Sequence, residues 1–125
     1  MYQVMLIDDE PWTLIYLNKL FSRPDLGFTV SASQSDASGA LSTILSNPPD
    51  VIVTDIQMPG LTGLKLLETI RQNHLQCLTV ILSAYAEFDY AKQALKFGAF
   101  DYLVKPVNTQ DVQNLLIQIR QHLEK

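Results

Sequence analysis

The chain has 125 residues, of which 47% are hydrophobic and 18% are charged, and its formal net charge is −4. This composition is typical of one globular domain, and the acidic balance argues against a domain whose main task is to bind nucleic acid or an anionic membrane. The single cysteine excludes an internal disulfide framework and a metal site built only from cysteines. No apolar run approaches the roughly 20 residues that cross a bilayer, and the early acidic residues exclude a signal peptide, so we expect a cytoplasmic domain.

Short apolar runs alternate with helical patterns along the chain. The runs cover residues 4–7, 28–30, 51–53, 78–82 and 102–104, and the strongest are continuous, as in parallel strands buried on both faces. Apolar residues spaced three and four apart separate and follow these runs, as in amphipathic helices. Five strands alternating with five helices predict an α/β fold with a parallel sheet covered on both sides. The last helical pattern runs to the end of the chain without a Gly or Pro that would terminate a helix, so we expect the natural protein to continue beyond it.

Polar residues follow four of the predicted strands. Asp8 and Asp9 follow the first, Asp55 the third, Ser83 the fourth and Lys105 the fifth. The carboxyl ends of parallel strands meet at one edge, where ligands bind. Each residue alone could be a helix cap, a turn residue or a solvated charge. Together, the carboxylates repel one another unless a hard divalent cation such as Mg²⁺ lies among them. The ammonium and hydroxyl groups would supply donors for a phosphoryl group.

The segments LIDDEP, VTDIQMPGLTG, VILSAY and GAFDYLVKP carry these residues in order. With them, the chain resembles the receiver domain of two-component response regulators from end to end, so residues 1–125 would form one such domain. The resemblance implies a flavodoxin-like (CheY-like), doubly wound, five-stranded parallel sheet of order 2-1-3-4-5, flanked by five helices. The opening DDEPW and the stretch LSAYAEFDYAKQALKFGAFDYLVKPV are most similar to receivers attached to an AraC-type helix-turn-helix output domain.

The resemblance also implies a metal site and a nucleophile. Asp55 would be the phosphoacceptor, which takes a phosphoryl group from the phosphohistidine of a sensor histidine kinase. Asp9 and Asp55 would bind Mg²⁺ directly together with the main-chain carbonyl of Gln57, and Asp8 would act mainly through water. The side chains of Gln57 and Tyr85 would flank the path of attack and tune dephosphorylation.

The remaining family positions would bind the phosphoryl group and report its presence. Lys105 would pair with one phosphoryl oxygen, while the Ser83 hydroxyl and the main-chain N–H of Ala84 would hold another. Pro106 would follow a cis peptide bond. Ser83 would move toward the phosphoryl group, and Tyr102 would rotate into the space it leaves. Without the resemblance, Tyr102 would be interpreted as a half-buried aromatic on an edge strand.

The implied protein is a switch rather than an enzyme, because it catalyses only its own phosphorylation and dephosphorylation. Its partners would be the kinase and its own C-terminal output domain, and the helix 4, strand 5 and helix 5 face would relay the change. We expect a homodimer on phosphorylation, contact with DNA only through the output domain, and no contact with membranes. We expect Trp12 to pack on the first helical turn rather than to contact the kinase.

Three other functions are compatible with parts of the pattern. A flavin-binding electron carrier of the same fold would need a phosphate cradle after the first strand, where the acidic DDEP would repel it. A phosphohydrolase that forms an aspartyl phosphate would place a D-x-D motif there. A degenerate receiver that acts only by protein contact would lack part of the acidic pocket.

Overall fold

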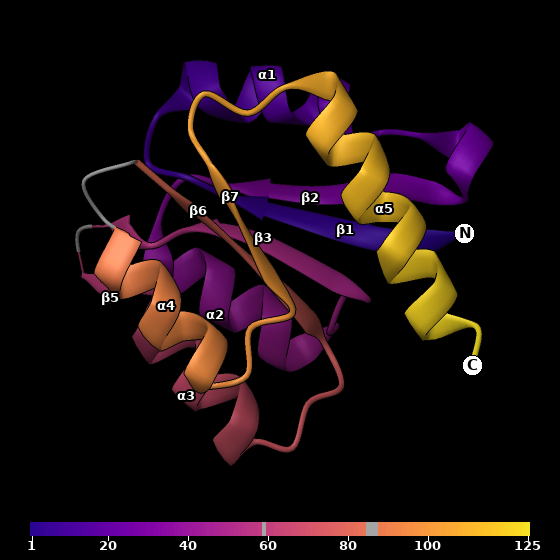
Figure 1. Ribbon diagram of the computed structural model, residues 1–125. Helices are drawn as coiled ribbons and strands as arrows, with labels where there is room; N and C mark the ends of the chain where they lie inside the picture. Colours follow the sequence, from indigo (N-terminus) through magenta and orange to yellow (C-terminus); the bar gives the residue numbers. More distant parts are fainter. Residues whose placement is uncertain (59, 85–87) are drawn as a thin grey trace.

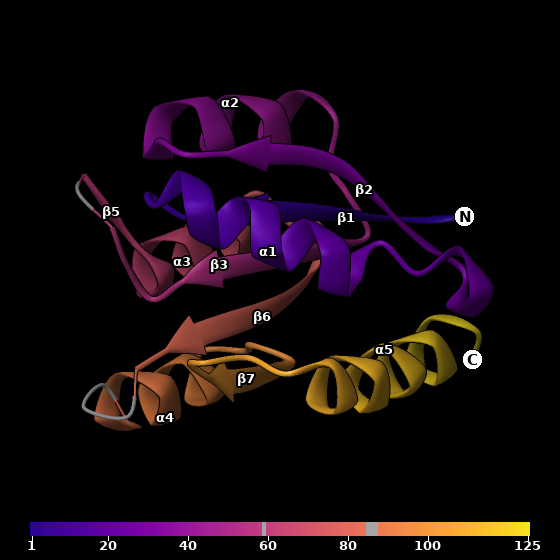
Figure 2. The ribbon, with the colours of Figure 1, turned by 90° about the horizontal axis from the view of Figure 1, so that it is seen from above.

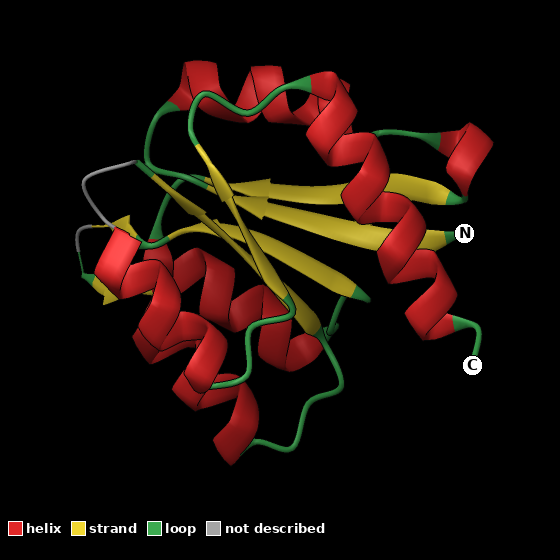
Figure 3. Cartoon of the chain, viewed as in Figure 1, coloured by secondary structure: helices red, strands yellow, loops and turns green. Residues whose placement is uncertain are grey.

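The computed structural model describes residues 1–58, 60–84 and 88–125, with the side chains of all these except residues 37, 57 and 61 (Figure 1). The main sheet consists of β1 (Tyr2–Ile7), β2 (Phe28–Gln34), β3 (Val51–Asp55), β6 (Leu78–Ser83) and β7 (Asp101–Val104). All neighbouring strands in it are parallel, and their order is β2-β1-β3-β6-β7. This is the predicted order 2-1-3-4-5. Figure 3 shows the sheet with helices packed around it, and the predicted fold class is confirmed.

Five α-helices connect or follow these strands in the described residues. They are α1 (Pro11–Phe21), α2 (Ala37–Ser46), α3 (Gly63–Gln72), α4 (Phe88–Lys96) and α5 (Thr109–Leu123). Two further features were not predicted from the sequence, namely the 3₁₀ helix η1 (Pro24–Leu26) and an antiparallel pair of β4 (Gln57–Met58) with β5 (Leu61–Thr62). Elements of two or three residues are too short to show a hydrophobic period, which explains why the sequence pattern missed them.

The two faces of the sheet are covered by different helices. Figures 1 and 2 show α1 and α5 on one face and α2, α3 and α4 on the other. Val4 and Leu6 of β1 pack in the cluster that includes α1 and α5, whereas Met5 and Ile7 pack in the cluster that includes α2 and α3. Successive side chains of a strand point to opposite faces. Both faces are therefore buried, which is the physical reason why the strand sequences are continuously apolar.

The helices after β1, β2 and β7 begin at the carboxyl-terminal edge of the sheet. Helices α2, α3 and α5 each begin with a side-chain cap that accepts a hydrogen bond from a backbone amide three residues later. The pairs are Asp36 with the Gly39 amide, Thr62 with the Lys65 amide and Asn108 with the Asp111 amide. Helix α1 begins at Pro11 after Glu10 and has no side-chain cap. Asp9, which taken alone could have been a helix cap, therefore does not cap this helix. Among the described residues, no helix combines the length and the apolar character needed to span a bilayer.

Candidate functional site

Four adjacent strands bring the predicted polar residues to one edge of the sheet. Asp8 and Asp9 directly follow β1, Asp55 ends β3, Ser83 ends β6, and Lys105 directly follows β7. The register pairs Asp55 with Leu82 and Ser83 with Val104 at the same level of the sheet. The strand order, which inserts β3 between β1 and β6, thus joins residues that lie as much as 97 positions apart.

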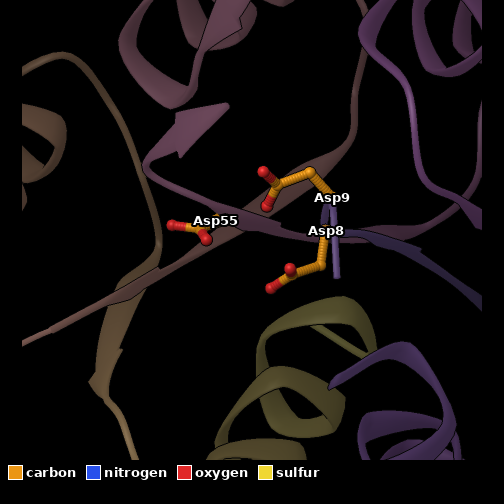
Figure 4. A group of neighbouring side chains, drawn as sticks. All are labelled: Asp8, Asp9 and Asp55. Carbon is orange, nitrogen blue, oxygen red and sulfur yellow. The ribbon is translucent and has the colours of Figure 1, made fainter. Parts of the chain in front are cut away.

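The three aspartates form a compact acidic group, which Figure 4 shows. One carboxylate oxygen from each of Asp8, Asp9 and Asp55 lies within 4.8 Å of the others. Asp8 is fully buried, Asp55 is partly buried and Asp9 is exposed. Carboxylates at this separation repel one another, and the repulsion is strongest where water is excluded. The group is therefore a place where positive charge is strongly favoured.

Lys105 supplies such a charge from the position directly after the edge strand β7. Its Nζ lies 3.1 Å from Asp8 Oδ2 and 3.0 Å from Asp55 Oδ2. Partial burial lowers the pKa of Lys105, but hydrogen bonds and charges from Asp55 and Asp8 outweigh burial and raise the pKa above its ordinary value of 10.5. The side chain is consequently a firmly protonated donor aimed at the phosphoacceptor candidate.

The backbone around Lys105 is anchored to β6. The Lys105 amide donates to the carbonyl oxygen of Ser83 at 2.8 Å. The Lys105–Pro106 peptide bond is cis, the isomer that the resemblance implied. Ser83 itself is 1% exposed, and its Oγ has no hydrogen-bond partner among the described residues. A buried hydroxyl without a hydrogen-bond partner is costly. The predicted role of Ser83 in holding a phosphoryl group stays a prediction.

The donor set fits a hard divalent cation. All three predicted ligand side chains are carboxylates, they converge within one coordination sphere, and Asp9 is open to solvent. Mg²⁺ binds through one or two protein carboxylates and keeps several waters, which an exposed acidic group permits. Gln57 lies in β4, two residues after Asp55, and its carbonyl ligand role stays a prediction. Pro59 and Tyr85, which the family motifs include, lie outside the described residues.

Tyr102 lies in the middle of the edge strand β7. It is half-buried, packs against the cluster that contains Ile81 and Ala94, and meets the Phe88 ring edge-on with centroids 6.3 Å apart. This is the half-buried edge-strand aromatic that the residue pattern alone suggests. Its predicted role in switching stays a prediction.

Two side chains of helix α1 lie in surroundings that the sequence did not predict. Trp12 is 81% exposed, so the expectation that it packs on the first helical turn is wrong. The reason is that the apolar face of α1 is formed by Leu17, Leu20 and Phe21, and Trp12 lies off that face. Tyr16 donates from its hydroxyl to the carbonyl oxygen of Val107 at 2.6 Å, across 91 residues of sequence. No local pattern signals a contact of that separation.

Known proteins resemble the chain over nearly all of its length. The family model described as the response regulator receiver domain matches residues 4–117. The transcriptional regulatory protein YesN of Bacillus subtilis is 31% identical over the whole chain, which covers 34% of that protein. The transcriptional regulatory protein HptR of Staphylococcus aureus is 34% identical over 93% of the chain, which covers 45% of that protein. The chain thus spans less than half the length of these curated relatives.

Solved structures of response regulators also resemble the chain. The REC domain of AraT, a response regulator from Geobacillus stearothermophilus, superposes with a TM-score of 0.90 at 28% identity, covering 98% of this chain and 95% of that one. A two-component transcriptional regulator AraC from Clostridium phytofermentans gives 0.85 at 28% identity, covering all of both chains. The relatives therefore include AraC-like regulators, as the opening DDEPW and the stretch over residues 82–107 predicted.

Proposed function

The chain belongs to the response regulator receiver family, and on this premise we propose that Asp55 accepts a phosphoryl group from a sensor histidine kinase. Receiver domains are signalling switches that bind Mg²⁺ at an acidic pocket, and this chain has the corresponding cluster of Asp8, Asp9 and Asp55. The observation that carries the proposal is the position of Asp55. Its carboxylate lies beside two further carboxylates and 3.0 Å from the Lys105 ammonium.

The proposed reaction is a transfer between two nucleophiles. A carboxylate oxygen of Asp55 attacks the phosphorus of the kinase's phosphohistidine, the phosphorus–nitrogen bond breaks, and the imidazole keeps the electron pair and takes up a proton. Lys105 turns from the carboxylate to a phosphoryl oxygen. The Ser83 hydroxyl and the Ala84 N–H donate to another oxygen. Mg²⁺, held by Asp9, Asp55 and the Gln57 carbonyl with Asp8 acting through water, would neutralise charge that develops during transfer.

The product state would shift the packing on one side of the molecule. A phosphoryl group adds charge and three acceptor oxygens close to the buried Ser83 hydroxyl. That hydroxyl makes no hydrogen bond among the described residues. Movement of Ser83 toward these oxygens would open space for Tyr102, which lies on the neighbouring strand β7. The face of α4, β7 and α5 would then carry the change to a partner.

The names and lengths of the relatives support a wider role. Both curated relatives are called transcriptional regulatory proteins, and this chain covers less than half of each. We infer that the switch controls a C-terminal output domain of the AraC helix-turn-helix type in the cytoplasm. DNA would be contacted through that domain, and phosphorylation would favour a homodimer. Trp12 is exposed and lines a pocket together with Lys105, and it is therefore available for contact with the kinase.

The decisive experiment measures the intact protein mass after incubation with acetyl phosphate, with and without Mg²⁺. We expect one labile phosphoryl adduct that requires Mg²⁺. Asp55→Asn should abolish the adduct. Asp50→Asn is the matched control, because Asp50 lies at the opposite end of the same strand, and it should leave the adduct unchanged.

Two results would contradict the proposal. One is an adduct that forms equally on Asp55→Asn. The other is failure of the folded protein to take up either acetyl phosphate or beryllofluoride, a mimic of the aspartyl phosphate, in the presence of Mg²⁺. Steady release of phosphate from added phosphate esters would instead favour the alternative function, in which this protein is an enzyme that hydrolyses phosphate esters.

A further inference from the structure

A tyrosine on α1 is hydrogen-bonded to the loop that carries the lysine of the site. The hydroxyl of Tyr16 donates to the Val107 carbonyl oxygen at 2.6 Å, although the residue as a whole is 48% exposed. Val107 is the second residue after Lys105 and is itself 5% exposed within the core cluster of α1 and α5. The bond therefore fixes one end of a short loop between β7 and α5.

The other end of this loop is fixed by the sheet. The Lys105 amide donates to the Ser83 carbonyl oxygen at 2.8 Å, and the segment from Lys105 to Val107 thus has one attachment on each side. Between α1 and the loop lies a pocket of about 480 Å³, and its lining includes Trp12, Tyr16, Lys105 and Pro106. The Tyr16 hydrogen bond therefore connects α1 with the loop beside this pocket, in addition to the packing of Val107 in the core cluster.

Helix α1 is also tied to the acidic group. It begins one residue after Glu10, whose amide donates to Asp8 Oδ1 at 2.9 Å. The Tyr16 hydrogen bond consequently links the element that follows the carboxylates with the loop that carries the ammonium. Asp8 is thus connected through α1 and the Tyr16 hydrogen bond to Val107. The chain then leads from Val107 to Lys105, whose ammonium contacts Asp8 and Asp55.

We propose that Tyr16 is a positioning residue for phosphoryl transfer, which holds the Lys105 backbone where its ammonium can serve Asp55. The proposal rests on the phosphoacceptor function given above. Only the lysine side chain then has to move when a phosphoryl group arrives, since its main chain is held on both sides. Loss of the hydroxyl would let the loop shift and would enlarge the range of positions that the ammonium samples.

The test compares Tyr16→Phe with the control Tyr90→Phe in the same protein. Tyr90 lies on α4 with 46% exposure, and no hydrogen bond among the described residues uses its hydroxyl. We expect Tyr16→Phe to slow phosphorylation by acetyl phosphate by about three- to ten-fold, the range set by one net hydrogen bond. The Mg²⁺ concentration at half-maximal rate should stay unchanged, because the carboxylates keep their positions. Tyr90→Phe should change neither quantity.

A double-mutant cycle with Lys105→Met separates positioning of the lysine from general support of the fold. In the Lys105→Met background, Tyr16→Phe should cause no further slowing. An equal slowing in both backgrounds, a shifted Mg²⁺ requirement, or a wild-type rate in Tyr16→Phe would each overturn the proposal.

A second readout does not depend on phosphorylation. Amide hydrogen exchange at Lys105 should be faster in Tyr16→Phe than in Tyr90→Phe, because the loop has lost one attachment. Equal exchange would overturn the proposed tether. If the wild-type protein accepts no phosphoryl group, the proposed function fails, and the exchange measurement still decides whether Tyr16 holds the loop.

Discussion

Two aspartates lie at opposite ends of β3 and have opposite surroundings. Asp50 directly precedes the strand, and its Oδ2 accepts a hydrogen bond from the Gln3 amide at 2.7 Å. Its main chain continues the pairing, with its amide donating to Gln3 and its carbonyl accepting from Leu78. Asp55 ends the strand and lies among two other carboxylates and an ammonium. The same residue type on one strand thus supports backbone structure at one edge and forms part of a charged cluster at the other.

The difference has an energetic meaning. A carboxylate that accepts a backbone N–H is stabilised in the folded state without any neighbouring charge. Three carboxylates within 4.8 Å raise the free energy of the resting fold unless cations offset them. We therefore expect substitutions at the Asp50 edge to change stability alone. Substitutions at the Asp55 edge should change stability and chemistry in ways that depend on the cation present.

The largest expected effect on stability comes from removing the ammonium at the charged edge. Lys105→Met should lower the free energy of unfolding by about 2 kcal/mol without Mg²⁺, less than for a fully buried pair because the lysine is partly exposed. Denaturant titration at low salt measures it. In saturating Mg²⁺ the deficit should shrink, because a cation that binds the folded carboxylates restores charge balance. A deficit that is independent of Mg²⁺ would contradict the comparison.

The same pair predicts a pH dependence at high pH. The folded-state pKa of Lys105 is raised, so its contribution to stability is fully present below the ordinary value of 10.5 and is lost as the pH rises through the higher folded value. The stability difference between wild type and Lys105→Met should accordingly shrink above pH 10.5. A difference that grows there would mean that the lysine is not paired in solution.

A smaller effect is expected at the opposite edge. Asp50→Ala removes the acceptor of the Gln3 amide and should lower the free energy of unfolding by about 1 kcal/mol. Asp50→Asn keeps a carbonyl oxygen as acceptor and should cost less. Thermal or denaturant unfolding checks both variants, and neither loss should depend on Mg²⁺. Phosphorylation by acetyl phosphate should be unchanged in both, and a slowed reaction would remove the distinction between the two edges.

The sequence predicted the fold and the membership of the acidic group for related reasons. Strands such as 51–53 and 78–82 are continuously apolar because helices cover both faces, and a parallel sheet gathers the residues after its strands at one edge. The order of the strands, which brings Asp8 and Asp55 together, came from the family resemblance rather than from periodicity.

The features that the sequence did not predict depend on contacts between distant side chains. The spacing of apolar residues predicted which face of α1 is buried, yet it could not show that Trp12 would be exposed. Nor could it show that the Tyr16 hydroxyl would reach the loop after β7. Both outcomes depend on where α1 lies relative to a segment some 90 residues away, which is a property of the packed fold. The short pair of β4 and β5 is likewise a local backbone arrangement without a hydrophobic signature.

The smallest expected effect on stability has the opposite sign. Ser83→Ala removes a buried hydroxyl that has no hydrogen-bond partner among the described residues. The free energy of unfolding should rise by about 0.5 kcal/mol, because the cost of the unsatisfied group disappears. Beryllofluoride binding in Mg²⁺ should weaken several-fold, since a donor for the phosphoryl position is lost. Denaturant unfolding and a beryllofluoride titration measure the two changes.

The matched control is Ser31→Ala, because Ser31 is exposed on β2 and neither quantity should change. A stability gain combined with weaker beryllofluoride binding would mean that Ser83 is kept for the phosphorylated state at the expense of the resting one. A stability loss would mean that the hydroxyl is already satisfied in the resting protein. In that case the charged edge would resemble the Asp50 edge in its hydrogen bonding, and the contrast between the two ends of the sheet would rest on the carboxylates alone.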